Sequence, residues 1–396
     1  MIPKGYKHTE LGVLPEDWEV VRLGDVCEIK KGKVNPKKTE TIPCVELEHI
    51  SQDTGMLLGF IDSREQLSIK NSFSKGDVLF GKLRPYLRKF WRASFDGVCS
   101  SEIWVLQGKK VSNAFLFYLV QTARFSQIAN ATCGTKMPRA DWKLMQDENF
   151  AIPPLAEQEK IAEILSTWDT QIQNFETLIA EKQALKKGLC QTLLTAKTRL
   201  KGFSGDWEVV RLGDVVDFFS GGTPKTTERK YYGGEIPFIK SAEIYNSTTQ
   251  EYLTQLGFKE SSAKWVKKGD LLYALYGANS GEVAISKIDG VINQAILCIK
   301  NQPEVLNTYF LYSVFLEKKE WITTRFLQGG QGNLSGKIVQ NLQISLPPLA
   351  EQEKIAEILS EVDNGITLLE QKLESLKSQK RGLMQKLLNG KVRTRI

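Results

Sequence analysis

The sequence predicts an α+β fold in which two similar globular domains lie at opposite ends of an antiparallel pair of long helices. Three observations support this prediction. Two blocks of sequence occur twice in the same order, a long helical stretch with a regular apolar stripe follows each second block, and short strand-like runs occupy the segments between the blocks. Because self-similarity of this extent indicates duplication of one structural unit, we expect a pseudo-two-fold relation between the two halves.

The repeated blocks define the duplication. Residues 17–26 (Asp-Trp-Glu-Val-Val-Arg-Leu-Gly-Asp-Val) recur letter for letter at 206–215. Residues 153–166, which begin Pro-Pro-Leu-Ala-Glu-Gln-Glu-Lys, recur unchanged at 347–360. Between the blocks only scattered positions match, although they keep register. We interpret this as one scaffold that carries two different reading surfaces; unequal drift after duplication is the alternative.

The blocks divide the chain into four segments. We expect a first globular domain at 1–152, a first long helix at 153–198, a second globular domain at 199–346 and a second long helix at 347–396. The sequence differs between the copies mainly at 27–152 and 216–346. Both of these cores contain short β-like runs, at 77–80 and 103–106 in the first and at 282–285 and 296–299 in the second. Each also contains one predicted helix, near 113–129 and 307–324.

The composition is that of an ordinary globular protein with a small basic excess. The chain has 396 residues, with 53 Lys and Arg against 46 Asp and Glu, a net charge of +7 and a pI of about 8.9. This charge permits a polyanionic partner without requiring one. No apolar run is long enough for a membrane helix, and no signal-peptide core begins the chain, so we expect a cytoplasmic protein that does not engage a membrane.

Motifs for catalysis or metal binding are missing. The six cysteines form no C-x-x-C pair and there are two histidines, which leaves few ligands for a metal or a His-based triad. The chain has no P-loop, no Asn-Pro-Pro-aromatic run of an amino-methyltransferase, and no H-E-x-x-H or G-x-S-x-G motif. The sequence therefore predicts no catalytic residue, no metal site and no cofactor on this chain.

Each long helix begins after a Pro-Pro pair, and proline is well tolerated in a first helical turn. The apolar residues then alternate in steps of four and three, which is the spacing of an a/d heptad seam. Lys182 and Lys186 fall on the seam of the first helix and weaken it. About 40 residues at 1.5 Å each would give a helix of roughly 60 Å. The predicted seam consists of Ile161, Leu165, Trp168, Ile172, Phe175 and Ile179 in the first helix, and Ile355, Leu359, Val362, Ile366, Leu369, Leu373 and Leu376 in the second.

A striped helix must bury its stripe, and the nearest equivalent stripe belongs to the other copy. Antiparallel pairing fits the order globule, helix, globule, helix, because parallel pairing would need a return crossing as long as the helix. It also imitates the self-complementary contact of a symmetric dimer. The alternative is that each helix packs only on its own globule.

Basic and polar loops provide candidate contacts to a nucleic acid. A run of cations interleaved with aromatic residues in the first core suits phosphate contact, although such a run can also be a plain solvated face. Gly-rich loops in the second core expose Thr, Asn, Gln and Ser, which can read base edges or hold phosphate; plain turns are the alternative. The candidate DNA-binding residues are Lys31, Lys33, Lys82, Arg84, Tyr86, Arg88, Lys89, Lys136 and Arg139 in the first core, and Thr223, Lys225, Lys240, Tyr276, Asn279, Gln331, Asn333 and Ser335 in the second.

The repeated helix starts contain polar residues that drift would not be expected to spare. We therefore interpret them as a docking surface for a partner protein. The predicted docking residues are Glu157, Gln158 and Lys160 in the first copy and Glu351, Gln352 and Lys354 in the second.

These features together resemble the specificity subunits of type I restriction-modification enzymes. The resemblance covers the whole chain. It rests on the duplicated Asp-Trp-Glu-Val and Leu-Gly-Asp entry at 17–26 and 206–215, on the Pro-Pro-Leu-Ala-Glu-Gln-Glu-Lys-Ile-Ala helix start at 153 and 347, and on the long helix after each. Segments 75–89 and 220–239 also resemble target-recognition domains. The seam lysines, Lys182 and Lys186, are a small departure.

The resemblance implies two target-recognition domains that each read one half of a split site in double-stranded DNA. It also implies that the helices set the spacing between the half-sites and dock methyltransferase (modification) subunits, in two copies, with a motor-nuclease (restriction) subunit joining the complex. S-adenosylmethionine, ATP and Mg would then act on the partner subunits. The alternatives are the specificity chain of a type IIB-like system, a coiled-coil scaffold without a DNA role, and a nucleic-acid enzyme in its own right.

Overall fold

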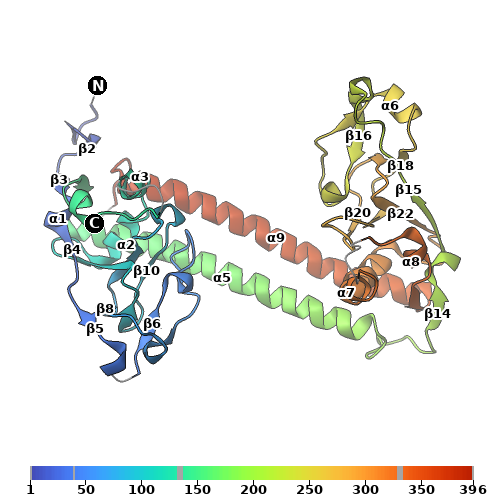
Figure 1. Cartoon of the computed structure of the whole chain (residues 1–396), viewed down its shortest axis with the longest axis horizontal. Helices are drawn as coiled ribbons and strands as arrows, with labels where there is room; N and C mark the ends of the chain where they lie inside the picture. The colour runs from blue at the N-terminus through green and yellow to red at the C-terminus, as the bar shows by residue number, and fades with distance from the viewer. Residues whose placement is uncertain (1, 39–40, 132–136, 328–332, 395–396) are drawn as a thin grey trace. The chain divides into compact units, whose positions relative to one another are not determined.

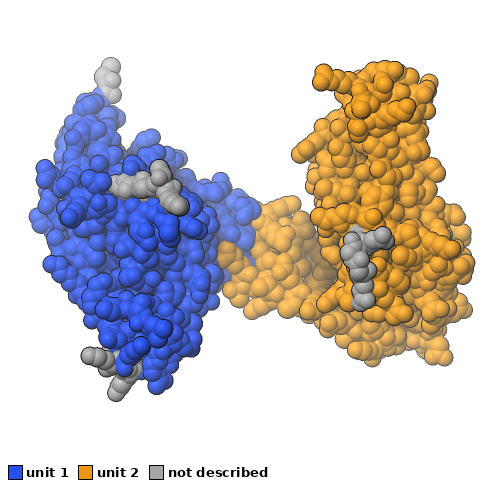
Figure 2. Space-filling view, in the orientation of Figure 1, with its two compact units in different colours: residues 1–175, 372–396 blue, residues 176–371 orange. Residues whose placement is uncertain are grey.

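The structure, a computed structural model, describes residues 2–38, 41–131, 137–327 and 333–394. It contains two compact units, which we call the first and the second unit (Figure 2). The first unit comprises residues 1–175 and 372–396, and the second comprises residues 176–371. Each unit therefore takes in the adjoining halves of both long helices and does not coincide with one of the four predicted segments.

The first unit contains a four-stranded and a five-stranded sheet together with two smaller strand pairs (Figure 1). The four-stranded sheet has the order β10 (Phe90–Arg92), β9 (Val78–Gly81), β12 (Ile103–Gly108) and β4 (Cys27–Ile29). The five-stranded sheet has the order β5 (Lys33–Val34), β8 (Lys70–Phe73), β11 (Gly97–Cys99), β6 (Pro43–Val45) and β7 (Ile61–Asp62), with β11 and β6 parallel. The strands β1 (Tyr6–Thr9) and β2 (Gly12–Pro15) form a hairpin, and β3 (Glu19–Arg22) pairs with β13 (Asn149–Ile152). The helices are α1 (Leu23–Val26), α2 (Asn113–Leu119), α3 (Ala123–Ala131) and α4 (Trp142–Met145), followed by the long α5 (Leu155–Leu193).

The second unit repeats this plan. Its first sheet has the order β15 (Val216–Ser220), β22 (Ile296–Asn301), β19 (Leu271–Ala274) and β20 (Val283–Ile285). Its second sheet has the order β17 (Tyr252–Leu253), β16 (Tyr232–Ile239), β21 (Gly290–Ile292) and β18 (Lys264–Val266), with β16 and β21 parallel. The strand β14 (Glu208–Arg211) pairs with β23 (Gln343–Leu346). The helices are α6 (Gln255–Lys259), α7 (Thr308–Phe326), α8 (Gly336–Gln340) and the long α9 (Leu349–Leu388).

The duplication predicted from the sequence is present in the strand order. The sheet β10-β9-β12-β4 has the same order as β20-β19-β22-β15, and the parallel pair β6–β11 corresponds to β16–β21. The predicted strand runs correspond to β9, β12, β20 and β22. The predicted helix near 307–324 is α7, whereas the one near 113–129 is interrupted between α2 and α3, where the Thr122 hydroxyl accepts the backbone N–H of Phe125 at 3.2 Å.

The long helices carry an apolar seam as predicted, and every predicted seam residue is buried or half-buried. Within the first unit the two helical segments run antiparallel, because Asp169 of α5 contacts Lys380 of α9 and Phe175 lies beside Lys372. Within the second unit Lys186, which comes later in α5 than Asp169, contacts Asp363, which comes earlier in α9 than Lys380, as antiparallel helices require. In each unit the start of one long helix and the end of the other pack into the hydrophobic core.

A glycine follows the end of the helix α9. Gly390 has a φ of +66°, a left-handed conformation that closes many helices. A Cβ at this position would lie 2.5 Å from the Pro15 ring, so the close approach also favours glycine. The Tyr6 hydroxyl donates to the carbonyl of Gly390 at 3.1 Å, which ties the helix end to the N-terminal hairpin of the first unit.

Candidate nucleic-acid interface

In the first unit, the basic loop that follows β9 lies against the segment that precedes α4. Leu83 and Arg139 form an isolated antiparallel bridge. Arg84 donates its backbone N–H to the carbonyl of Pro138 at 2.7 Å, and the carbonyl of Lys82 accepts the backbone N–H of the residue after Arg139 at 2.9 Å. The structure therefore brings together Lys82, Arg84 and Arg139, which are far apart in the sequence. We call this region the first edge.

The tip of the basic loop is a tight turn. Pro85–Leu87 forms one 3-10 turn, and the flanking Arg84 and Arg88 have φ angles of 52° and 49°. Few residues other than glycine adopt this left-handed conformation, so the turn is held by its surroundings. It leaves Tyr86 with 52% of its surface exposed. Lys136, another predicted contact, lies outside the described residues.

Two of the predicted phosphate contacts are used inside the domain. The guanidinium of Arg88 donates to the side chains of Asp53 and Ser126 and to a backbone carbonyl. The Lys89 ammonium donates to the carbonyl of Leu47 at 2.6 Å. These cations anchor the basic loop to neighbouring segments, and their role as DNA contacts stays a prediction. Arg84 remains exposed and Lys82 is half-buried.

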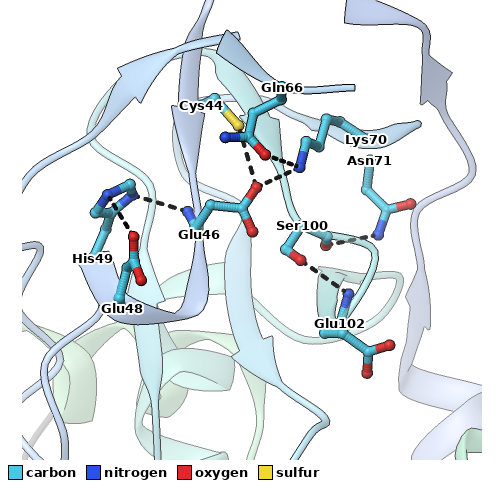
Figure 3. A network of polar contacts seen from close by, with 9 residues as sticks. All are labelled: Cys44, Glu46, Glu48, His49, Gln66, Lys70, Asn71, Ser100 and Glu102. Carbon is cyan, nitrogen blue, oxygen red and sulfur yellow. Dashed lines mark hydrogen bonds and ion pairs between the residues drawn. The ribbon is translucent and has the colours of Figure 1, made fainter. Parts of the chain in front are cut away.

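The basic residues of the other sheet connect to the same region. Lys31 is exposed, and Lys33, on the edge strand β5, donates to the Asn71 side chain at 2.7 Å. Asn71 in turn donates to the carbonyl of Ser100 at 3.4 Å (Figure 3) and to the carbonyl of Ile103 at 2.9 Å. Asn71 therefore holds the loop that precedes β12, next to the first edge.

That loop carries a residue that the sequence reasoning missed. Glu102 accepts hydrogen bonds from Arg139, with Nε to Oε2 at 3.0 Å and Nη2 to Oε1 at 3.4 Å. Hydrogen bonding to Glu102 raises the pKa of Arg139, so the guanidinium stays charged. The signal was absent from the sequence because Glu102 becomes relevant only when the fold places its loop beside Arg139.

In the second unit, the equivalent loops form a second edge. Tyr276 and Asn333 form an isolated antiparallel bridge. Leu334 donates its backbone N–H to the carbonyl of Leu275 at 2.6 Å. The Ser335 hydroxyl caps α8 by accepting a backbone N–H of its first turn at 3.3 Å. Tyr276, Asn333 and Ser335, predicted from separate Gly-rich loops, are thus adjacent.

A second residue that the sequence reasoning missed joins these loops. The Tyr276 hydroxyl donates to the carbonyl of Gln294, and the Thr223 hydroxyl bonds to the Gln294 side-chain amide. Gln294 is exposed and lies in the loop that precedes β22. Thr223 and Tyr276 therefore meet through Gln294, which no motif in the sequence marked.

The second edge borders a hollow of about 360 Å³. Lys240 lies there in an ion pair with Glu251 at 2.9 Å. Lys225 is exposed and Asn279 is half-buried in neighbouring turns, while Gln331 lies outside the described residues. The hollow is lined by Thr223, Thr226, Arg229, Tyr232, Phe238, Lys240, Glu251 and Asn293.

The two edges share a backbone plan and differ in chemistry. In each unit the loop after β9 or β19 pairs with the segment before α4 or α8, and also bonds to the loop before β12 or β22. The first edge presents Arg84, Tyr86 and an Arg139–Glu102 pair. The second presents Asn333 and Gln294. One scaffold therefore displays two different sets of hydrogen-bonding groups.

The repeated glutamates at the helix starts are buried. Glu157 has no exposed surface and accepts hydrogen bonds from the Trp18 indole at 2.9 Å and from Arg393, with Nε at 2.8 Å and Nη2 at 2.9 Å. In the second unit Glu351 accepts from the Arg199 guanidinium at 2.8 and 2.7 Å and from the Trp207 indole at 3.2 Å. Each glutamate therefore joins the helix start, the repeated Trp and the segment after the opposite helix.

The neighbouring glutamines are buried as well. Gln158 accepts the backbone N–H of Ser112 at 2.9 Å and donates to the carbonyl of Pro153 at 2.9 Å. Gln352 accepts the backbone N–H of Asn307 at 2.9 Å and donates to the carbonyl of Pro347 at 2.8 Å.

The prediction that Glu157, Gln158, Glu351 and Gln352 form a docking surface is wrong, because their repetition reflects an internal hydrogen-bonding task that each unit must perform. Lys160 and Lys354 lie at the surface in ion pairs with Glu163, at 2.8 Å, and Glu357, at 2.6 Å. For these two lysines docking stays a prediction.

Lys186, one of the two lysines on the seam of the first helix, and Lys380 of α9 have partners on the opposite helix. Lys186 pairs with Asp363 at 2.6 Å, and Lys380 pairs with Asp169. Each aspartate also accepts a tyrosine hydroxyl, from Tyr118 in the first unit and from a tyrosine of α7 in the second. Burial, with a contribution from the aspartate, raises the pKa of both tyrosines, so they remain hydrogen-bond donors. Lys186 and Lys380 thus belong to a polar contact that is repeated in the two units.

The residues that the structure describes lack two kinds of feature. Among these residues, no three His, Cys, Asp or Glu side chains gather as a metal ion would need. None of the described helices combines the length and apolar character required to span a membrane.

Comparison with known sequences identifies a family. The family described as type I restriction modification DNA specificity domain matches the chain twice, at residues 15–182 and 204–378. The chain is 26% identical over 416 residues to the type I restriction enzyme MjaVIII specificity subunit of Methanocaldococcus jannaschii, covering 96% of this chain and 94% of the relative. It is 21% identical to the MjaIX specificity subunit of the same organism, over 98% of this chain and 96% of the relative.

Solved structures with the same fold agree with this match. The type I restriction-modification system S subunit from M. genitalium has a TM-score of 0.65 at 16% identity, over 93% of this chain and 96% of that chain. A chain from a study of complex assembly and conformational transition of the type I R-M system has a TM-score of 0.58 at 23% identity, over 96% of this chain and 99% of that chain. At these identities the likeness shows the shared fold.

Proposed function

The chain belongs to the family of type I restriction modification DNA specificity domains, and we propose that it is the specificity subunit of a type I complex. In this role it recognises a split target in double-stranded DNA, with one unit for each half-site. It performs no chemistry itself, because methyl transfer and cleavage take place on partner chains.

The observation that carries this proposal is the pair of edges. Both are built on the same bridge between the loop after β9 or β19 and the segment before α4 or α8. The groups that they expose differ, from Arg139 and Tyr86 in the first unit to Asn333 and Gln294 in the second. Arginine suits guanine, and Asn and Gln suit adenine, in the major groove. A repeated frame with exchanged polar groups is what reading two different half-sites requires.

The proposed partners follow from the same role. We propose that two methyltransferase subunits dock on this chain and that a motor-nuclease subunit joins them. S-adenosylmethionine, ATP and Mg would be bound by those subunits. The surface lysines at the helix starts, Lys160 and Lys354, offer charge for such docking.

Purified chain tested alone distinguishes this role from catalysis. We expect it to bind double-stranded DNA with an affinity that falls as salt rises, because phosphate contacts release counterions. With S-adenosylmethionine it should transfer no methyl group to DNA above the level of a protein-free control, and addition of its modification subunit should start transfer. Methyl transfer by the chain alone would contradict the proposal, as would DNA affinity that is insensitive to salt.

A further inference from the structure

We propose that Arg139 reads a guanine in the first half-site, and that Glu102 is the positioning residue that orients its guanidinium. This inference rests on the proposed function and deepens it, because it assigns one base contact to one residue. Arg139 was a candidate for DNA binding in general, whereas the structure gives it a partner and a defined free edge.

The hydrogen bonds of the pair decide which edge of the guanidinium is available. Glu102 accepts from Nε at 3.0 Å and from Nη2 at 3.4 Å, which occupies the side edge of Arg139. The end edge, made by Nη1 and the second hydrogen of Nη2, remains to donate two parallel hydrogen bonds. Two parallel donors match O6 and N7 of guanine in the major groove, the commonest specific contact of arginine with DNA.

The pair is held on both sides. The backbone of Arg139 is bridged to Leu83, and the residue before it accepts the backbone N–H of Arg84 at 2.7 Å. On the other side, the Ser100 hydroxyl accepts the backbone N–H of Glu102 at 3.4 Å (Figure 3), and Asn71 donates to the carbonyls of Ser100 and Ile103. A side chain that is fixed before binding loses less entropy on contact with a base.

Electrostatics favours a base over a phosphate as the ligand of Arg139. The carboxylate of Glu102 balances the charge of the guanidinium and would repel a phosphate brought within bonding distance. The acceptors of guanine carry no net charge, so they avoid this repulsion. Lys82 and Arg84 supply the neighbouring cations for the DNA backbone.

The pair is also accessible. The side chain of Arg139 is 45% exposed and that of Glu102 is 26% exposed. Exposure of this size leaves the end edge of the guanidinium open to a groove of DNA, while the ion pair fixes its direction.

The test uses the complex of this chain with its modification subunit. Methylation mapping first defines the target of the wild-type complex. Synthetic targets are then made in which each guanine of the first half-site is replaced by 7-deazaguanine, which lacks the N7 acceptor. We expect one such replacement to reduce methylation by the wild-type complex roughly 5- to 150-fold, the range of a good bidentate contact. The Arg139→Lys complex, which keeps the charge but replaces the rigid fork by a single ammonium, should respond less to that replacement.

Variants separate reading from folding. Glu102→Gln should weaken discrimination at the same base pair as Arg139→Lys. The double variant should lose little more discrimination than either single variant, because the two residues act as a unit. Arg84→Ala is the matched control: it should weaken binding to all sequences alike. Circular dichroism melting of each variant checks that the unit remains folded.

Three results would overturn the inference. Arg139→Lys could leave discrimination unchanged at every position of the first half-site, or it could weaken discrimination in the second half-site instead. Glu102→Gln could weaken discrimination at a different base pair from Arg139→Lys. Failure of the proposed function looks different, because the wild-type complex would then show no split target at all.

Discussion

Replacing Glu157 with alanine should lower the free energy of unfolding of the first unit by about 3–5 kcal/mol, the usual cost of removing one partner from a buried charged cluster. Glu157 is fully buried and accepts three hydrogen bonds, from the Trp18 indole and from two nitrogens of Arg393. Without the carboxylate, the indole N–H has no acceptor inside the core, and the segment after α9 loses its anchor. Chemical denaturation followed by tryptophan fluorescence measures the effect.

The same helix offers a matched control. Glu159 is exposed two residues further on, and its replacement by alanine should change stability by no more than about 0.5 kcal/mol. Glu351→Ala should reproduce the loss in the second unit, where Arg199 and Trp207 are the donors. If Glu157→Ala and Glu159→Ala lowered the free energy of unfolding by equally small amounts, the internal role of Glu157 would be contradicted. Docking of a partner would then be the better explanation of the repeat.

Inserting four residues into both long helices should lengthen the unread gap of the target and leave the half-sites unchanged. The insertions duplicate residues 172–175 and residues 368–371, so they fall at the boundary between the units. The contacts Asp169–Lys380 and Lys186–Asp363 then stay intact within their own units. Each helix grows by about 6 Å, while four residues make about 1.1 turns and rotate the seam by only some 40°.

At about 3.4 Å per base pair, this growth corresponds to one or two base pairs. Such an insertion is a stutter, which coiled coils accommodate by local unwinding. Methylation mapping of cells that carry the insertion variant reports the gap directly. The same insertion in only one helix serves as the control and should abolish methylation, because the paired contacts lose register. An unchanged gap with activity retained would show that the helices do not set the spacing.

Much of the fold could be predicted from the sequence because it depends on local periodicity and on repetition. The heptad spacing from Ile355 to Leu376 predicted the seam, and these residues are buried or half-buried in α9. The exact repeat of 17–26 at 206–215 predicted two copies of one structural unit, and the equivalent strand pairs β3–β13 and β14–β23 agree with it. Both signals can be read from a single sequence, because the heptad spacing is local and the repeat appears when two short segments are compared.

The site was less predictable because it depends on contacts between distant segments. The basic run suggested phosphate contact for Arg88, yet its guanidinium is used by Asp53 and Ser126. The repetition of Glu157 suggested a surface, yet the fold places Trp18 and Arg393 around it. A polar residue that recurs in a duplication can serve either a partner or the interior. Only the three-dimensional positions of its donors distinguish these two cases.

Glu102 and Gln294 illustrate the opposite error, since nothing in the sequence marked them. Each lies in a short loop before a central strand, β12 or β22, and gains its place when the loop after a neighbouring strand folds against it. Comparing the two copies by structural position, with the bridges Leu83–Arg139 and Tyr276–Asn333 as the guide, locates both residues. The duplication therefore points to Glu102 and Gln294, but only after the strands of the two copies are matched in the fold.

The claim that each unit reads one half of a split target is tested most directly by exchanging one core. Residues 216–346 are replaced by the corresponding core of a relative with a known target, and the complete complex is expressed in cells whose methylation is then mapped. The account predicts that the second half-site becomes that of the donor, while the first half-site and the length of the gap stay those of the parent. A hybrid in which both half-sites change, or in which neither does, would contradict it.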